Sequence, residues 1–280
     1  MTTAGSGRKV ADETAPPLVY CGSGRRYGLQ SRSGYTPLPF EMNYSPVNTV
    51  SLILVVRNEE VALGSMLPRL PTNVFDDCFA IDGNSRDRTV EILESAGIRS
   101  YRQSRPGLGA ARLEGRAHVT TDAFVFFSPD GNEEPADLPR VVTMLREGNP
   151  FVVASRMIEG AWNEEDDQLF KWRKYANQGF VLLANLLFSR GGNRTTDVTN
   201  GFRGISCQAW DAMKITSEDL TIDYQMVIRA LKAGIPIKEF PTREGQRIGG
   251  ETNFPSLQTG LAELGLLIRE TRMGRRSLES

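Results

Sequence analysis

Short apolar runs of strand length alternate with helical segments from Thr49 to Arg156. Continuous apolar strands are typical of a parallel sheet with helices on both faces, so we predict an α/β fold. Ligands of such folds bind at the carboxyl ends of the strands. The predicted strands are 49–56, 74–82, 98–103, 123–127 and 150–156. We therefore expect one rim of the sheet to carry Arg57–Glu59, Asp82, Arg105–Gly109, Asp130 and Arg156.

The second half of the chain is less regular. Apolar residues recur at three- and four-residue steps over 165–189, which predicts one long helix with a buried stripe. A strand-like segment at 199–207, a helix at 223–234 and an edge strand at 236–244, broken by Pro241, follow it. The stripe consists of Leu169, Trp172, Ala176, Phe180, Leu183 and Leu187.

Three regions follow from these patterns. Residues 1–47 are rich in Gly, Ser, Pro and Arg without a sustained period, so we predict a partly irregular extension, which packs on the body or forms a flap over the site. Residues 48–254 form the α/β domain. Residues 255–280 form an amphipathic basic helix and tail with Leu257, Leu261, Leu264 and Ile268 on one stripe. We expect this stripe to pack on the body, with contact to an anionic membrane surface as the alternative.

Composition excludes several classes of protein. The formal net charge of −1 gives no reason to expect a nucleic-acid partner. The three cysteines lack the spacing of a disulfide framework or a zinc site. The N-terminus has no signal-peptide core, and the apolar run at 179–188 is about half of the roughly 20 residues that a bilayer requires. We expect a cytoplasmic protein, and homo-oligomerisation stays open.

The segment "FVFFSPDGNEEP" at 124–135 is a buried strand that runs into polar groups. Alternate residues of an extended chain point the same way, so Ser128, Asp130 and Asn132 could face one ion. Mg²⁺ and Mn²⁺ take oxygen ligands, need few from the protein and keep several waters. We predict a site for Mg²⁺ or Mn²⁺ held by Asp130 and Asn132, with Ser128 assisting through its hydroxyl or a water.

Four ordered segments together resemble the family-2 glycosyltransferases of the GT-A fold: "VVRNEE", "DGNSRDRT", "GLGA" and "SPDGNEEP". Later segments are similar to the polyprenyl-phosphate sugar transferases related to dolichyl-phosphate mannose synthase. These later segments are 154–156, 197–203, 222–241 and 247–252. The resemblance covers roughly residues 49–254 and implies a GT-A domain with a Rossmann-like, mostly parallel sheet.

The resemblance implies a site for a nucleotide-sugar donor. Asp82 would bind its base or ribose, and a divalent cation at Asp130 would stabilise the diphosphate leaving group. Ser128 replaces the first aspartate of the family's pair, which either tunes the site or marks a weakened one. The other residues implied in donor binding are Val55, Arg57, Glu59, Ser85, Gly107 and Arg112.

Two further predictions concern the acceptor. Arg156, Arg203 and Arg247 lie in segments that match the family, and three converging guanidinium groups would suit a phosphate. A phosphate acceptor is already anionic and needs little help from a general base. A hydroxyl acceptor needs one, and Asp223 is then the candidate.

The leading hypothesis is a metal-dependent inverting glycosyltransferase with a polyprenyl phosphate as acceptor, peripheral to the membrane. A second hypothesis keeps the donor and transfers the sugar to a soluble hydroxyl acceptor, such as a natural product or a phosphorylated metabolite. A third is a non-catalytic protein that binds nucleotide sugars.

Overall fold

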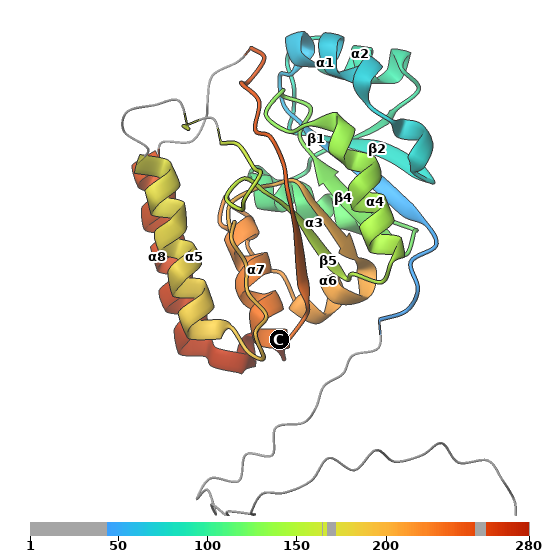
Figure 1. Cartoon of the computed structure of the whole chain (residues 1–280). Coiled ribbons are helices and arrows are strands. Elements are labelled where there is room, and N and C mark those ends of the chain that lie inside the picture. The colour runs from blue at the N-terminus through green and yellow to red at the C-terminus, as the bar shows by residue number, and fades with distance from the viewer. Residues whose placement is uncertain (1–43, 164, 167–171, 250–255, 280) are drawn as a thin grey trace, which may run out of the picture. The chain divides into compact units, whose positions relative to one another are not determined.

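The computed structural model describes residues 44–163, 165–166, 172–249 and 256–279. These residues form a seven-stranded sheet in the order β3-β2-β1-β4-β6-β5-β7 (Figure 1). The strands are β1 (Val50–Val56), β2 (Asp77–Asp82), β3 (Arg99–Arg102), β4 (Ala123–Phe127), β5 (Phe151–Ser155), β6 (Arg203–Ser206) and β7 (Ile237–Pro241). All the predicted strands are present, and Pro241 ends the edge strand β7 as expected. The predicted extension 1–47 lies almost entirely outside the described residues.

The sheet is mostly parallel. β1 pairs in parallel with both β2 and β4, so the strand order reverses around β1. The exception is β6, which runs antiparallel to β4 and β5. Open α/β sheets bind ligands beside such a reversal point, outside the carboxyl ends of the strands. The topology therefore indicates a ligand site at the loops after β1, β2 and β4.

Eight α-helices accompany the sheet in the described part of the chain. They are α1 (Glu60–Met66), α2 (Thr89–Ser95), α3 (Leu108–His118), α4 (Leu138–Arg146), α5 (Trp172–Phe188), α6 (Cys207–Met213), α7 (Ile222–Ala233) and α8 (Ser256–Met273). Short 3-10 turns occur at Leu67–Arg69, Thr72–Val74, Pro135–Asp137 and Gly274–Leu278. None of the described helices is long and apolar enough to cross a membrane.

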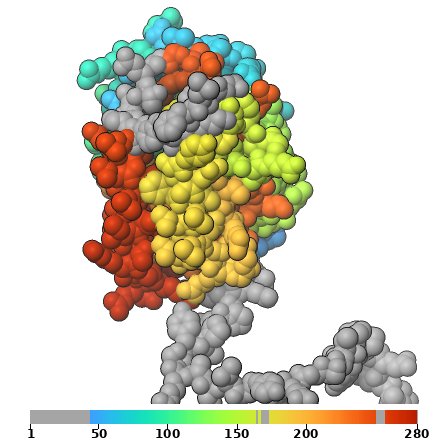
Figure 2. All heavy atoms as spheres, turned by 60° about the vertical axis from the view of Figure 1, so that its left-hand side comes forward, coloured from blue at the N-terminus to red at the C-terminus, as the bar shows by residue number. Residues whose placement is uncertain are grey.

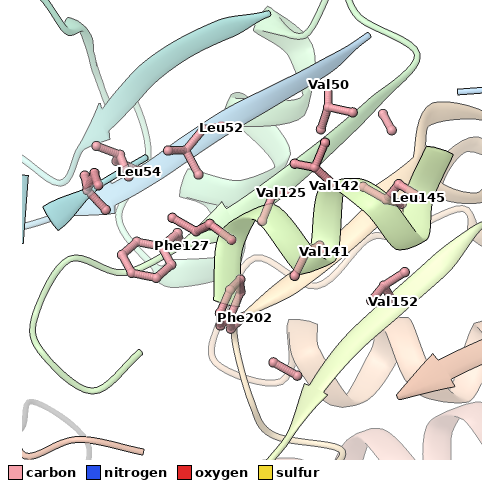
Figure 3. Packing of buried hydrophobic residues seen from close by; sticks show 14 of the residues in the cluster. Val50, Leu52, Leu54, Val125, Phe127, Val141, Val142, Leu145, Val152 and Phe202 are labelled. Atoms are coloured by element: carbon pink, nitrogen blue, oxygen red, sulfur yellow. The ribbon is translucent and has the colours of Figure 1, made fainter. Parts of the chain in front are cut away.

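The two faces of the sheet have separate cores because successive strand residues point to opposite sides. Leu52 and Leu54 of β1 pack on one face with residues of α1, α2 and α4, whereas Ile53 packs on the other with α3, α6 and α7. Figure 3 shows the first core, where Val141 and Leu145 of α4 lie over the strands. The continuous apolar runs in the sequence thus reflect burial on both faces.

A third cluster joins α5, α7 and α8, which contact one another in pairs. Ala184 and Phe188 of α5 and Leu266 and Leu267 of α8 face this cluster. The predicted stripe on 165–189 is wrong in part: Leu183 and Leu187 are exposed, although Ala176 and Phe180 are half-buried. Helices α5 and α8 each carry apolar residues on more than one face. The three- to four-residue period therefore did not identify which side of the helix is buried. Residues 167–171 of that stripe lie outside the described residues.

The stripe predicted on the C-terminal helix is also exposed. Leu257, Leu261, Leu264 and Ile268 all face away from the body of the protein. The face of α8 that packs inward instead carries Glu263, Leu266, Leu267 and Glu270. Glu270 is acceptable there because Arg229 and Lys232 of α7 pair with it.

Candidate active site

A cavity of about 800 Å³ opens at the carboxyl ends of β1, β2 and β4. Its walls come from the loops that follow these strands, from the start of α3, and from the segment after β7. The cavity continues to α5, α7 and α8, where Ala176, Phe180, Asp223 and Gly260 line it. It therefore has a polar part at the sheet and a mixed part between helices.

The loops after β1 and β2 are joined by hydrogen bonds. The backbone N–H of Asn58 donates to Ser85 Oγ at 2.9 Å, and that of Glu59 donates to Thr89 Oγ1 at 2.8 Å. Asp82 accepts the N–H of Ser85 at 3.1 Å. Asn58 adopts a positive φ of 54°, which these bonds hold in place. The motif at 82–89 thus fixes the shape of the rim.

Asp82 itself is not among the residues that line the cavity. Its side chain is 4% exposed and accepts the hydrogen bond from the N–H of Ser85, so it positions the loop. Asp82 thus positions the loop in this structure, and its contact with the base or ribose of the nucleotide stays a prediction. Val55, Arg57, Glu59 and Ser85 do line the cavity, as predicted for the donor site.

The glycines of "GLG" allow a close approach between backbones. A Cβ on Gly107 would lie 2.3 Å from the carbonyl oxygen of Glu218, and one on Gly109 would lie 2.3 Å from that of Ser217. The N–H of Gly109 donates to the carbonyl of Asp219 at 3.1 Å. Gly107 also lines the cavity. A glycine is required at this position because segment 217–219 lies so close and because Gly107 has a positive φ of 116°.

The turn after β4 carries the predicted metal ligands. Asp130 is buried, and Oδ1 of its carboxylate accepts the N–H of Asn132 at 3.0 Å. Burial raises the pKa of Asp130, whereas that N–H, Arg247 and the side chain of Ser128 lower it. Oδ1 of Asn132 is buried without a hydrogen-bond partner among the described residues. An unpaired amide oxygen beside a carboxylate is a donor set that suits a hard divalent cation.

The segment after β7 lies directly against this turn. The N–H of Gly245 donates to the carbonyl of Asn132 at 2.8 Å, and that of Ile248 donates to the carbonyl of Asp130 at 2.7 Å. Gly131 has a φ of 97°, and a Cβ there would lie 2.6 Å from Ile248. We call residues 245–248 the strap, since they cross the turn and hold its conformation.

Arg247 of the strap links the two acidic residues of the rim. Its Nη2 pairs with Glu59, and its Nη1 lies 3.5 Å from Oδ2 of Asp130. Glu59 is buried, which raises its pKa to about 7 although Arg247 opposes the shift. In this arrangement Arg247 neutralises two carboxylates, and its contact with an acceptor phosphate stays a prediction.

The other two predicted phosphate ligands are also engaged. Arg156 lines the cavity, but it donates to Asp197 at 2.8 Å and to Glu244 at 2.6 Å. Arg203 is fully buried, does not line the cavity and donates to three backbone carbonyls, those of Val198, Asn200 and Asp223. Arg203 thus holds the segment before β6, and its contact with an acceptor phosphate stays a prediction.

Asp223, in the first turn of α7, pairs with Arg112 of α3 deep in the cavity. Both side chains are nearly fully buried, and Arg203 Nε lies 3.6 Å from the same carboxylate. The Nε atom of Arg112 has no hydrogen-bond partner among the described residues. The pair presents one carboxyl group and one guanidinium group to any molecule in the cavity.

Three exposed arginines line the cavity: Arg57, Arg86 and Arg243. None of them pairs with a carboxylate among the described residues. The sequence predicted Arg57 as a site residue but missed the other two. Arg243 stacks over the ring of Trp162 at 5.3 Å, and its segment after the predicted edge strand gave no separate signal.

Glu263 of α8 also lines the cavity and was not predicted. Burial, together with the nearby Asp223, raises its pKa to about 7. An acid on the side of a helix opposite its leucine stripe is expected to be exposed. On α8 the stripe is exposed and Glu263 is buried, so the pattern is misleading for this residue. The cavity thus contains a carboxyl group that exchanges a proton near neutral pH.

The fold and the cavity at the strand ends define a GT-A type sugar transferase. The chain belongs to the family described as Glycosyl transferase family 2, whose model matches residues 51–209. The match ends before α7, the strap and α8, which contribute to the cavity.

Curated relatives carry related names. Glycosyltransferase AglJ of Haloferax volcanii is 24% identical over 215 residues, which are 76% of this chain and 69% of the relative. An uncharacterized glycosyltransferase of Mycobacterium tuberculosis, Rv0539, is 24% identical over 205 residues, 73% of this chain and 89% of the relative.

Solved structures support the same fold. Glucosyl-3-phosphoglycerate synthase from M. tuberculosis, in complex with UDP, superposes with a TM-score of 0.60 at 19% identity, covering 80% of each chain. Its complex with Mn²⁺, UDP and glucosyl-3-phosphoglycerate gives a TM-score of 0.59 at 21% identity, covering 89% of this chain and 86% of that one.

Proposed function

We propose that this glycosyltransferase moves a hexose from a nucleotide-diphosphate sugar to the phosphate of a polyprenyl phosphate, with inversion at the sugar carbon. The observation that carries the proposal is the two-part cavity. Its polar part lies at the strand ends, and its other part, at α5 and α8, is mixed: Ala176, Phe180 and Gly260 offer apolar surface beside polar residues such as Asn177 and Glu263. A donor with two phosphates and an acceptor with a phosphate and an apolar chain fit these two parts.

The donor would lie over the rim. Val55 and Arg57, which line the cavity, would border the base, and Arg57 and Arg86 would contact the diphosphate. Asp130 and Asn132 would hold Mg²⁺ or Mn²⁺, with the diphosphate and water supplying other ligands, because no three Asp, Glu, His or Cys side chains gather as a metal site in the described residues. The cation would stabilise the negative charge that develops on the leaving diphosphate. Structural neighbours that hold Mn²⁺ or Mg²⁺ with UDP support this assignment.

The acceptor phosphate would lie near Arg243, an exposed guanidinium group that lines the cavity. A phosphate carries its own negative charge near neutral pH and attacks without a general base. This matches a cavity in which Asp223 is already paired with Arg112. Asp223 would then orient Arg112 instead of removing a proton.

One observation favours a second candidate, a soluble phosphorylated acceptor with a reactive hydroxyl. Glu263 and Asp223 place two carboxyl groups in the acceptor part of the cavity, and a hydroxyl acceptor needs a base. Neighbouring structures contain phosphoglyceric acid, which is an acceptor of that kind.

The test offers each radiolabelled UDP, GDP and dTDP sugar, with Mn²⁺, to polyprenyl phosphate and to 3-phosphoglycerate in parallel. Label in the butanol-extractable lipid, released by mild acid, would support the proposal. Label in phosphoglycerate alone would replace it with the second candidate. Asp223→Asn separates the two again, because a hydroxyl acceptor should lose turnover by roughly 100-fold or more when its base is removed.

A further inference from the structure

The outer surface of α5 and α8 exposes large apolar side chains. Nine of the ten exposed large hydrophobic residues in the described part of the chain lie on these two helices. Leu186 of α5 is 75% exposed and Leu261 of α8 is 62% exposed. Leu182 lies one turn before Leu186, and Leu257 lies one turn before Leu261, so each helix presents a stripe.

The two stripes belong to one surface. α5 and α8 contact each other, and they lie side by side along one flank of the domain (Figure 1). In the space-filling view they form adjacent yellow and red bands (Figure 2). We call this surface the leucine face. An exposed contiguous apolar surface of this kind marks an interaction site, because single exposed leucines are ordinary but a two-helix set is not.

The exposed charges on α5 and α8 have one sign in the described residues. α5 contains no Asp or Glu, and both acids of α8, Glu263 and Glu270, are buried. The chain just beyond α5, the last turns of α8 and the turn that follows α8 expose arginines: Arg190, Arg194, Arg269, Arg272 and Arg276. The tail exposes one acid, Glu279, so this end is mainly cationic and complements a surface that is apolar inside and anionic outside.

We propose that the leucine face docks on an anionic lipid bilayer, with its leucines in the acyl boundary and its arginines among the headgroups. Apolar burial and attraction to anionic lipid act together in such contacts. A second copy of the chain fits less well, because pairing this face with itself would gather arginines without exposed carboxylates on either helix to meet them. The same two helices line the acceptor part of the cavity through Phe180 and Gly260. Docking would bring that part to the membrane, a benefit that depends on the lipid acceptor proposed above.

The experiment is vesicle flotation of the full chain with phosphatidylcholine vesicles, with and without 30% phosphatidylglycerol. The wild type should float with the anionic vesicles, and 0.5 M salt should weaken this. The double variant Leu186→Glu/Leu261→Glu should lower partitioning by roughly tenfold or more, because it replaces buried apolar contacts with charge. The matched control is Val61→Glu on α1, a residue that is 68% exposed and lies off this face; it should float like the wild type.

Light scattering and thermal unfolding complete the test. The three proteins should be equally folded, since the substituted side chains are exposed. A wild type that ignores anionic vesicles, or a double variant that floats as well as the control, overturns the proposal. A wild-type dimer that the double variant converts to a monomer, without vesicle binding, assigns the face to a second copy.

Failure of docking and failure of the proposed function remain distinguishable. Transfer to a short-chain, water-soluble prenyl phosphate without vesicles tests the function alone, and the double variant should retain it. With a long-chain acceptor in vesicles the double variant should lose it. Vesicle binding without transfer to any prenyl phosphate would leave the docking surface intact and reject the acceptor.

Discussion

At the scale of single residues, the candidate site depends on a few buried polar atoms. Within the part of the chain that the structure describes, Asn132 Oδ1 has no hydrogen-bond partner, whereas Asp130 accepts one N–H and lies near Arg247. The side chain of Ser128, which replaces the first aspartate of the family's pair, forms a hydrogen bond with Asp130 and so supports that carboxylate. The site therefore has one carboxylate whose removal should be decisive.

Asp130→Asn should lower metal-dependent transfer by at least roughly 100-fold, since even changes around a metal ligand cost up to that much. The side chain keeps its size, so the fold should survive, and thermal unfolding without ligand checks this. Transfer is measured over a range of Mn²⁺ concentrations. Ser128→Asp serves as the comparison: a sharp gain in activity there would mean that the natural turn is a weakened metal site.

Glu263→Gln should change how stability depends on pH. Because burial raises the folded-state pKa of Glu263 to about 7, its contribution is present below its unfolded pKa and is lost as pH rises through 7. Relative to the wild type, the variant should gain about 2 to 3 kcal/mol in free energy of unfolding between pH 5 and pH 8. Urea unfolding at both values measures it. A constant difference between the two proteins would mean that Glu263 is not strained in the folded state.

At the scale of elements, close backbone contacts fix the rim. α3 begins against segment 217–219, and the strap crosses the turn after β4. These contacts join segments about 110 residues apart, and the small size of glycine makes them possible. The start of α3, which forms part of the cavity wall, is thus held by segment 217–219, which is distant in the sequence.

Gly109→Ala should destabilise the protein by about 1 to 3 kcal/mol, because the added methyl group would meet backbone oxygen. Gly64→Ala on α1 is the control: nothing lies within 4 Å of its Cβ, and alanine favours a helix by up to about 1 kcal/mol. Urea unfolding should move the two midpoints in opposite directions. Equal midpoints would show that segment 217–219 moves away at little cost.

At the scale of the whole molecule, the sequence predicted the sheet well because its strands are buried on both faces and carry unbroken apolar runs. It predicted that Ser128, Asp130 and Asn132 border one cavity for a local reason, since all three lie within five positions; their role as metal ligands stays a prediction. It could not predict that Arg247 would pair with Glu59, 188 positions away, or that Arg203 would satisfy backbone carbonyls. Partner choice depends on tertiary geometry, and so does which side of an all-round apolar helix is exposed, as on α5.

Donor binding should stabilise the whole domain. A nucleoside diphosphate with Mn²⁺ at 100 times its Kd adds about 2.7 kcal/mol, which should raise the Tm by roughly 5–10 °C. A thermal-shift series with UDP, GDP and dTDP identifies the base. Asp130→Asn should lose the part of the shift that needs Mn²⁺, and an equal shift with the nucleoside alone would contradict binding through the diphosphate.

The strap has a consequence for how members of this family can be recombined. Residues 245–248 hold the turn of Asp130, yet they lie outside the matched 51–209 region, as do α7 and α8. The segments proposed to bind the donor and those proposed to bind the acceptor therefore cannot be exchanged independently. A chimera that exchanges residues 210–280 with those of a relative would change nucleotide and metal affinity together with acceptor choice.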